Sequence, residues 1–210
     1  MHISEEALHK AGATTIAAAG SSAEETRIIA DHLVRANLTG HDSHGAGMVP
    51  TYIKSIQAGL LKPNTPVELV SDSGSIMVFD GQRGFGQRVA REAMDQAIER
   101  CHETGLVLMA LRNAHHIGRV GSYGEQSLAA GLISLSFVNV TDHPPLVTAY
   151  NGAQARFLTN PICFAMPATE QHPAALLDMA TSKIALGKAR VALYSGKPVD
   201  EGCLLDAEGQ

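Results

Sequence analysis

The sequence has no tryptophan, and its four Tyr and five Phe leave only 4% of the 210 residues aromatic. It also has no block of Lys and Arg, and its formal net charge is −5. A chain of this charge is a poor candidate for nucleic-acid or membrane-surface binding. The chain does have ten histidines, which favour polar chemistry in a pocket over aromatic recognition.

Cysteine is scarce as well. Cys101, Cys163 and Cys203 are odd in number and widely spaced, which is typical of a reducing compartment and predicts no disulfide framework. No CxxC pair indicates a thiolate zinc site. Residues 1–6 lack the basic and apolar parts of a signal peptide, and apolar runs such as 106–111 are too short to span a bilayer. We expect a soluble cytoplasmic protein.

The composition is that of a globular chain, with 45% hydrophobic and 18% charged residues. The first 66 residues predict helices. Ser4 begins one, the capping box Ser22-Ala23-Glu24-Glu25 begins a second that ends at Gly40, and Met48, Tyr52 and Ile56 mark the apolar face of a third.

Beyond Pro66 the pattern predicts an α/β fold. A β-hairpin is expected from 67–70 and 76–79, and a buried strand at 106–111. Helices are expected before Gly105, before Gly131 and over about 182–194, with further strands at 133–139, 162–166 and 175–179. We therefore predict a helical region followed, from about residue 67, by an α/β region.

The first segment that indicates chemistry is Asp42-Ser43-His44-Gly45. If a helix begins here, Ser43 and His44 lie where free N–H groups favour an anion, and His44 can exchange protons near neutral pH. Tyr52, eight residues on, adds a phenolic donor close to the same face. The alternative is that Asp42 or Ser43 is only an N-cap and His44 a surface residue.

The second segment runs from Arg112 to Gly121 and contains the pair His115-His116. It follows a predicted strand and precedes a helix, where α/β folds place site residues. Two His beside Arg112 and Arg119 suit an anionic ligand, with glycines that allow close backbone approach. A glycine-rich turn with a core histidine is an equally good interpretation at this point, and a zinc site a weaker one.

A dinucleotide fingerprint is missing, because Gly84-Phe85-Gly86 is followed by Val89 where GxGxxG needs its third glycine. No Walker A or GxSxG sequence occurs either. The run Leu177–Ser182 by itself indicates a strand end and a helix capped by Thr181 or Ser182. The residues alone thus predict a histidine acid–base site for an anionic substrate.

Four motifs together resemble the type-2 malate/L-lactate dehydrogenase family: Gly40–Gly45 with Tyr52, Asn113–Arg119, Thr159-Asn160-Pro161, and Leu177–Ser182. Their order and spacing match over essentially the whole chain. The segment Asp42–Pro50 and Gly202-Cys203-Leu204 are most similar to its hydroxycarboxylate dehydrogenase B branch.

The resemblance implies an oxidoreductase that uses NAD or NADP to interconvert 2-oxo acids and 2-hydroxy acids, and a homodimer. It implies a helical substrate and dimerisation region over 1–66. It also implies a non-Rossmann cofactor domain over 67–210, with a mostly antiparallel mixed sheet flanked by helices. Since the family continues past a segment like 205–210, we expect the cofactor domain to be truncated at the C-terminus.

The resemblance also implies the site. His44 and His116 are the proton-transfer residues, and Ser43, Tyr52 and Arg119 bind substrate. No metal is implied. The residues implied for the cofactor are Gly118, Thr159, Asn160, Asp178, Met179, Ala180, Thr181 and Ser182.

Three alternatives stay open. The chain is a truncated, catalytically impaired member, or a relative that acts on an imine, a ureido acid or a sulfonate, or, more remotely, a metal-dependent hydrolase built on its histidines. Many relatives carry Arg where this chain has Met48, which favours a substrate with an apolar side chain.

Overall fold

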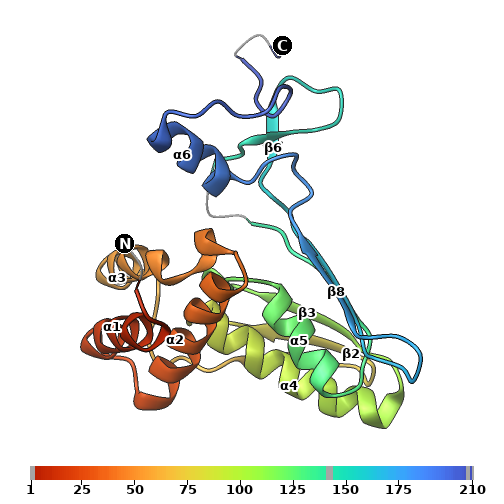
Figure 1. Cartoon of the computed structure of the whole chain (residues 1–210). Helices are drawn as coiled ribbons and strands as arrows, with labels where there is room; N and C mark the ends of the chain where they lie inside the picture. Colours follow the sequence, from red (N-terminus) through yellow and green to blue (C-terminus); the bar gives the residue numbers. More distant parts are fainter. Residues whose placement is uncertain (1–2, 141–143, 207–208, 210) are drawn as a thin grey trace. The chain divides into compact units, whose positions relative to one another are not determined.

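The computed structural model describes residues 3–140, 144–206 and 209. The chain forms two compact units, Met1–Leu132 and Ile133–Gln210, which are described separately (Figure 1). This division does not coincide with the composition change at residue 66. The assignment of substrate and cofactor functions to 1–66 and 67–210 stays a prediction.

The first unit begins with the predicted helices α1 (Glu5–Ala18), α2 (Ala23–Leu38) and α3 (Val49–Gln57). The Ser4 hydroxyl caps α1 by accepting a hydrogen bond from the N–H of Ala7. Buried side chains from the helices and the segments after them form one core cluster, which consists of Ile16, Ile29, Leu33, Val49, Tyr52, Leu61 and Phe85. The apolar faces expected from helical spacing are therefore the faces that pack.

The expected capping box at the start of α2 is only half formed. The Ser22 hydroxyl accepts from the N–H of Glu25, but the Glu25 carboxylate does not return to Ser22. It is fully buried, accepts the N–H of Asn64 at 3.0 and 2.8 Å, and lies 3.2 Å from Arg88. Asn64 instead satisfies Ser22 N–H through its side chain. Glu25 thus ties α2 to distant segments, which local spacing does not show.

A three-stranded sheet completes the first unit, with order β1 (Glu68–Asp72), β2 (Ile76–Asp80) and β3 (Leu108–Arg112). The predicted hairpin is confirmed, since β1 and β2 are antiparallel. β2 and β3 are parallel and are joined by α4 (Gly86–Thr104), which packs along the sheet over Met77 and Phe79 (Figure 1). The short helix α5 (Gly121–Ala129) follows.

The prediction that 106–111 is a buried strand is wrong. In β3 every second side chain is exposed, with Leu108 at 65%. The other side chains, Met109 and Leu111, pack against the core under α4. In the described chain β3 pairs only with β2. The apolar side chains of this run therefore alternate between a buried face and an exposed face of the sheet.

The second unit contains an antiparallel sheet of order β4 (Ser134–Phe137), β7 (Ile162–Met166) and β8 (Ala175–Met179). One of its faces carries exposed apolar side chains, among them Leu135, Phe137 and Leu177. A two-stranded sheet of β5 (Val147–Thr148) and β6 (Ala155–Phe157) was not predicted, and α6 spans Leu186–Ser195.

The α/β class, with N-terminal helices and small mixed or antiparallel sheets, is confirmed. Within the described residues, none of the helices combines the length and apolarity that crossing a membrane requires.

The buried Glu25 carboxylate gives a test of this fold. Glu25→Gln removes the charge that pairs with Arg88 and places an N–H₂ group near the N–H of Asn64. We expect the free energy of unfolding in urea to fall by about 2–3 kcal/mol. Glu24→Gln, at the neighbouring exposed position, is the matched control and should change it by less than about 0.5 kcal/mol. Equal losses in the two variants would contradict the role given to Glu25.

Candidate active site

Two histidines from segments 72 residues apart meet in the first unit. Nδ1 of His44 lies 3.0 Å from Nε2 of His116, and the rings are nearly parallel, with centroids 5.2 Å apart. Nδ1 of His116 lies 2.7 Å from the hydroxyl of Tyr52, which in turn accepts from Nε2 of Gln87 at 2.6 Å. A continuous chain of hydrogen bonds therefore runs from Gln87 to His44.

No α-helix begins at Asp42, so the helix N-terminus considered for Ser43 and His44 does not form there. The segment that carries His44 forms two 3₁₀ turns, Asp42–His44 (η1) and Ala46–Met48 (η2), and α3 begins only at Val49. Asn37 at the end of α2 organises the turns, because its side chain donates to the carboxylate of Asp42 and accepts from the N–H of Ala46. Asp42 thus holds the turn without capping a helix, and His44 is half-buried.

The loop that carries His116 is held by its backbone against the start of α4. Gly86 opens this helix, and a Cβ at that position would overlap the carbonyl oxygens of His115 and His116. The N–H of His115 also donates to the carbonyl of Gly84. Gly86 thus makes room for the histidine loop, and the carbonyl of Gly84 helps to hold it.

His32 on α2 supports the same loop from the other side. Its Nε2 accepts the N–H of Arg119 at 3.0 Å. Gly118, at φ +75°, lies so close that a Cβ would overlap the His32 ring. Burial, followed by the charge of Arg119, lowers the pKa of His32 to about 4. His32 is therefore neutral at pH 7 and fixes the turn at Gly118 as a hydrogen-bond acceptor.

The three residues predicted to bind substrate differ from one another in exposure and in their contacts. Tyr52 is fully buried within the network, Ser43 is exposed beside His44, and Arg119 is 4% exposed with its guanidinium 3.0 Å from Glu125. Met48 is half-buried against the core cluster. The structure therefore groups Tyr52 with His44 and His116, and it pairs Arg119 with a carboxylate.

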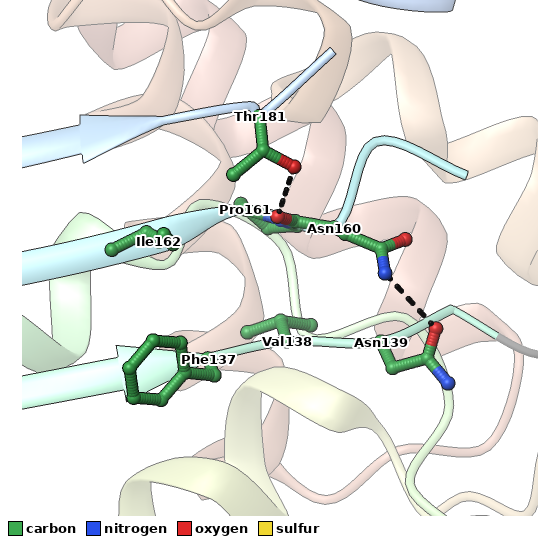
Figure 2. A pocket seen from close by; sticks show the side chains of 7 residues that line it. All are labelled: Phe137, Val138, Asn139, Asn160, Pro161, Ile162 and Thr181. Atoms are coloured by element: carbon green, nitrogen blue, oxygen red, sulfur yellow. Dashed lines mark hydrogen bonds between the residues drawn. The ribbon is translucent and has the colours of Figure 1, made fainter. Parts of the chain in front are cut away.

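A hollow of about 340 Å³ lies at the ends of β4 and β7, and two of the predicted cofactor residues, Asn160 and Thr181, line it (Figure 2). It is lined by Phe137, Val138, Asn139, Asn160, Pro161, Ile162 and Thr181. Asn160, at φ +40°, has a buried Oδ1 with no hydrogen-bond partner among the described residues. Its Nδ2 lies 3.5 Å from Oδ1 of Asn139. The hollow thus has an apolar wall, and the Asn160 amide is among the groups that line it.

Thr181 and Ser182 do not cap a helix, so that prediction is wrong. The Thr181 hydroxyl donates to the carbonyls of Thr159 and Asn160, and α6 begins four residues after Ser182 without a side-chain cap. Thr181 thereby joins the two motifs of this unit. Asp178 and Met179 end β8, with Asp178 beside Cys163 in the register, and Ala180 links them to Thr181.

Sequence reasoning missed three residues that build the site, namely Asn37, Gln87 and His32. Each acts on a partner far along the chain or outside its own helix, so helical spacing carries no signal of it. Within the described residues no three His, Cys, Asp or Glu side chains are grouped as metal ligands.

An α/β protein with two hydrogen-bonded imidazoles on a buried phenol has a site for acid–base chemistry. The family model for malate/L-lactate dehydrogenase matches residues 3–210. The chain belongs to this family.

Individual relatives agree with this membership. Hydroxycarboxylate dehydrogenase B of Escherichia coli O157:H7 is 47% identical over 190 residues, which cover 90% of this chain and 52% of that protein. Sulfolactate dehydrogenase from Methanocaldococcus jannaschii has a TM-score of 0.90 at 33% identity, over 100% of this chain and 60% of the other. For Δ1-piperideine-2-carboxylate reductase from Pseudomonas syringae the TM-score is 0.88 at 26% identity, over 100% of this chain and 62% of the other. The chain spans about half the length of the curated relatives it matches.

The close approach at Gly86 predicts a strong effect of one methyl group. Gly86→Ala forces the backbone that carries His116 away from α4, and we expect a loss of about 2 kcal/mol or more in unfolding free energy. Gly12→Ala is the control, because Gly12 lies within α1 with nothing near its Cβ position. That change should stabilise the chain by about 0.5–1 kcal/mol. A neutral Gly86→Ala variant would refute the packing described.

The low pKa of His32 predicts acid sensitivity. Between about pH 6.5 and 4 the unfolded chain binds a proton at His32 that the native state does not, so stability falls as the pH falls through this window. His32 should account for about 2 kcal/mol of loss between pH 7 and pH 5. Urea titrations at the two pH values measure it, and His32→Gln, which does not titrate, should lose that much less. An unchanged pH dependence in His32→Gln would count against a buried neutral His32.

Proposed function

We propose that the chain is part of an oxidoreductase that uses NAD or NADP to interconvert 2-oxo acids and 2-hydroxy acids. The observation that carries this proposal is the His44–His116 pair held by buried Tyr52, in a chain of the malate/L-lactate dehydrogenase family. A carbonyl that is reduced to an alcohol needs one proton at its oxygen, and an imidazole is suited to give it near neutral pH.

We infer the roles of the two rings from their hydrogen bonds. Both nitrogens of His116 are engaged, Nε2 with His44 and Nδ1 with Tyr52. Nδ1 of His44 faces His116, and Nε2 is the other ring nitrogen of His44. We therefore assign proton exchange with the substrate oxygen to Nε2 of His44. His116 orients that ring and passes charge along the network. Exposed Ser43, beside His44, is assigned to the substrate carboxylate.

The hollow of the second unit fits a nicotinamide cofactor. A flat ring with a carboxamide needs an apolar wall and a hydrogen-bond partner, and the hollow has Val138 and Ile162 in its wall and Asn160 among its lining residues (Figure 2). When bound, the nicotinamide gives or takes the hydride. We assign Asn160, Thr159 and the segment Asp178–Ser182 to holding it. Gly118 in the first unit keeps its expected cofactor role within this proposal.

Two relatives indicate the substrates to test beyond simple 2-oxo acids. One is named for sulfolactate and one for a cyclic imine carboxylate. Both compounds, like malate and lactate, place an anionic group near the reacting carbon. A homodimer in the cytoplasm is part of the same proposal. The exposed apolar face of Leu135, Phe137 and Leu177 supports assembly.

The proposal predicts activity that depends on both histidines. Oxidation of NADH or NADPH is followed with pyruvate, oxaloacetate, glyoxylate, phenylpyruvate, sulfopyruvate and Δ1-piperideine-2-carboxylate. His44→Ala and His116→Ala should each lower kcat by about 100-fold or more, because a positioned acid–base group is lost. Their effect on cofactor affinity should be small.

His9→Ala is the matched control, since His9 pairs with Asp31 on the surface of the helical region, and it should leave turnover unchanged. Silence with every substrate in a folded protein, or full activity in both site variants, would overturn the proposal.

A further inference from the structure

Gln87 is the buried end of the hydrogen-bond network. It is 1% exposed, near the start of α4, and its Nε2 donates to the Tyr52 hydroxyl. Its Oε1 is buried and has no hydrogen-bond partner among the described residues. Leaving a buried amide oxygen unpaired costs about 1–3 kcal/mol. An acceptor held in this way next to a hydroxyl group needs an explanation.

The directions of the hydrogen bonds supply one. Since the phenol oxygen accepts from Gln87, its own proton goes to Nδ1 of His116. Neutral His116 then carries its proton on Nε2 and donates it to Nδ1 of His44. The orientation of the Gln87 amide therefore belongs to the state in which both imidazoles are neutral.

In the state in which His44 is an imidazolium, every one of these bonds is reversed. Imidazolium His44 carries protons on both nitrogens, so its Nδ1–H donates to Nε2 of His116. The proton of His116 then lies on Nδ1 and is donated to the Tyr52 oxygen. The Tyr52 O–H must now find another acceptor. It finds one in Oε1 of Gln87, if the amide turns over by 180° about its last bond. No atom is lost or gained except the one proton taken up.

We propose that Gln87 is a positioning residue whose amide turns over when His44 takes up a proton, so that Tyr52 stays hydrogen-bonded in both states of the site. The change in hydrogen bonding does not depend on the proposed function; only the role of this change in catalysis rests on it. Burial raises the pKa of the Tyr52 phenol well above its usual range, so Tyr52 keeps its proton throughout and only changes the direction in which it donates.

The other titratable or charged groups around the network are Asp42, His32, His115, Tyr123, Arg119 and Glu125. Asp42 precedes His44 in η1, and the His115 ring meets Tyr52 edge-on at 5.7 Å. His32 titrates only near pH 4, and burial keeps Tyr123 protonated. Arg119 and Glu125 pair with each other. The charges of His32, Tyr123 and the Arg119–Glu125 pair thus stay constant between pH 5 and 9, where the paired histidines are to be followed.

The test is the position of the ring protons, read from long-range ¹H–¹⁵N correlations of the ¹⁵N-labelled full chain without cofactor or substrate. His44→Ala and His116→Ala assign the signals. In the wild type at high pH, His116 should carry its proton on Nε2. Below the midpoint of the titration, His44 should be doubly protonated and the His116 proton should lie on Nδ1. A His116 that keeps one tautomer across the titration would overturn the proposal, and this measurement needs no variant of Gln87.

Substitutions of Gln87 give the second arm. Gln87→Met keeps the volume but offers no acceptor to the Tyr52 hydroxyl in the protonated state of the site. The histidine pair should therefore bind a proton about tenfold more weakly, and the midpoint of its titration should move down by about one pH unit. Gln87→Glu accepts from the phenol, so its midpoint should lie at or above that of the wild type. Gln96→Met, on the opposite side of α4, is the control and should titrate like the wild type.

The titration midpoints of the two Gln87 variants decide whether the proposal holds. If Gln87→Met titrates like the wild type, or if Gln87→Glu shifts downward with it, the proposal is wrong. If the tautomer of His116 switches as described but no substrate is turned over, the inference stands and the proposed function fails.

Discussion

The hydrogen bond between the Tyr52 hydroxyl and Nδ1 of His116 is the interaction on which the site depends. Tyr52 is fully buried in the core shared by the helices, and an unpaired phenol there would cost several kcal/mol. Pairing therefore fixes the loop of residues 113–120 against α3. Only with this loop in place do His44 and His116 meet at 3.0 Å. The same bond that completes the core thus assembles the candidate chemistry.

The start of α4 supplies both the space and the partner for this bond. Gly86 allows the backbone of the histidine loop to approach, and the next residue, Gln87, reaches the phenol from within the core. From the opposite side, neutral His32 accepts the N–H of Arg119. The loop is therefore held by backbone contacts at both ends, while hydrogen bonds and the neighbouring His44 ring orient the side chain of His116.

The sequence predicted what depends on neighbouring residues. The helices α1 to α4 and the hairpin follow from apolar spacing, caps and turn residues, and their partners lie close along the chain. The motifs also named His44, His116 and Tyr52 as site residues, and the structure brings these three side chains into contact. Their functional roles stay predictions.

Features that depend on distant partners could not be predicted in this way. The spacing of Ser22 and Glu25 fits a local capping box, yet the carboxylate is used by Asn64 and Arg88. Thr181 has the position of a helix cap, yet its hydroxyl joins two loops. The run 106–111 is apolar on both faces, and no local signal tells that one face of β3 is open. In each case the local sequence fits two structures equally well, and a contact with a distant residue or its absence decides which one forms.

The nature of the groups behind His44 has a consequence for the direction of a reversible reaction. A carboxylate behind an imidazole favours the charged ring, which suits a base that holds its proton. Here the support is a second imidazole, a phenol and an amide, and each of these can both donate and accept. Such a support adds no charge that favours one protonation state over the other. A site that must give a proton in reduction and take one in oxidation gains from that balance, because the same residues then serve both directions.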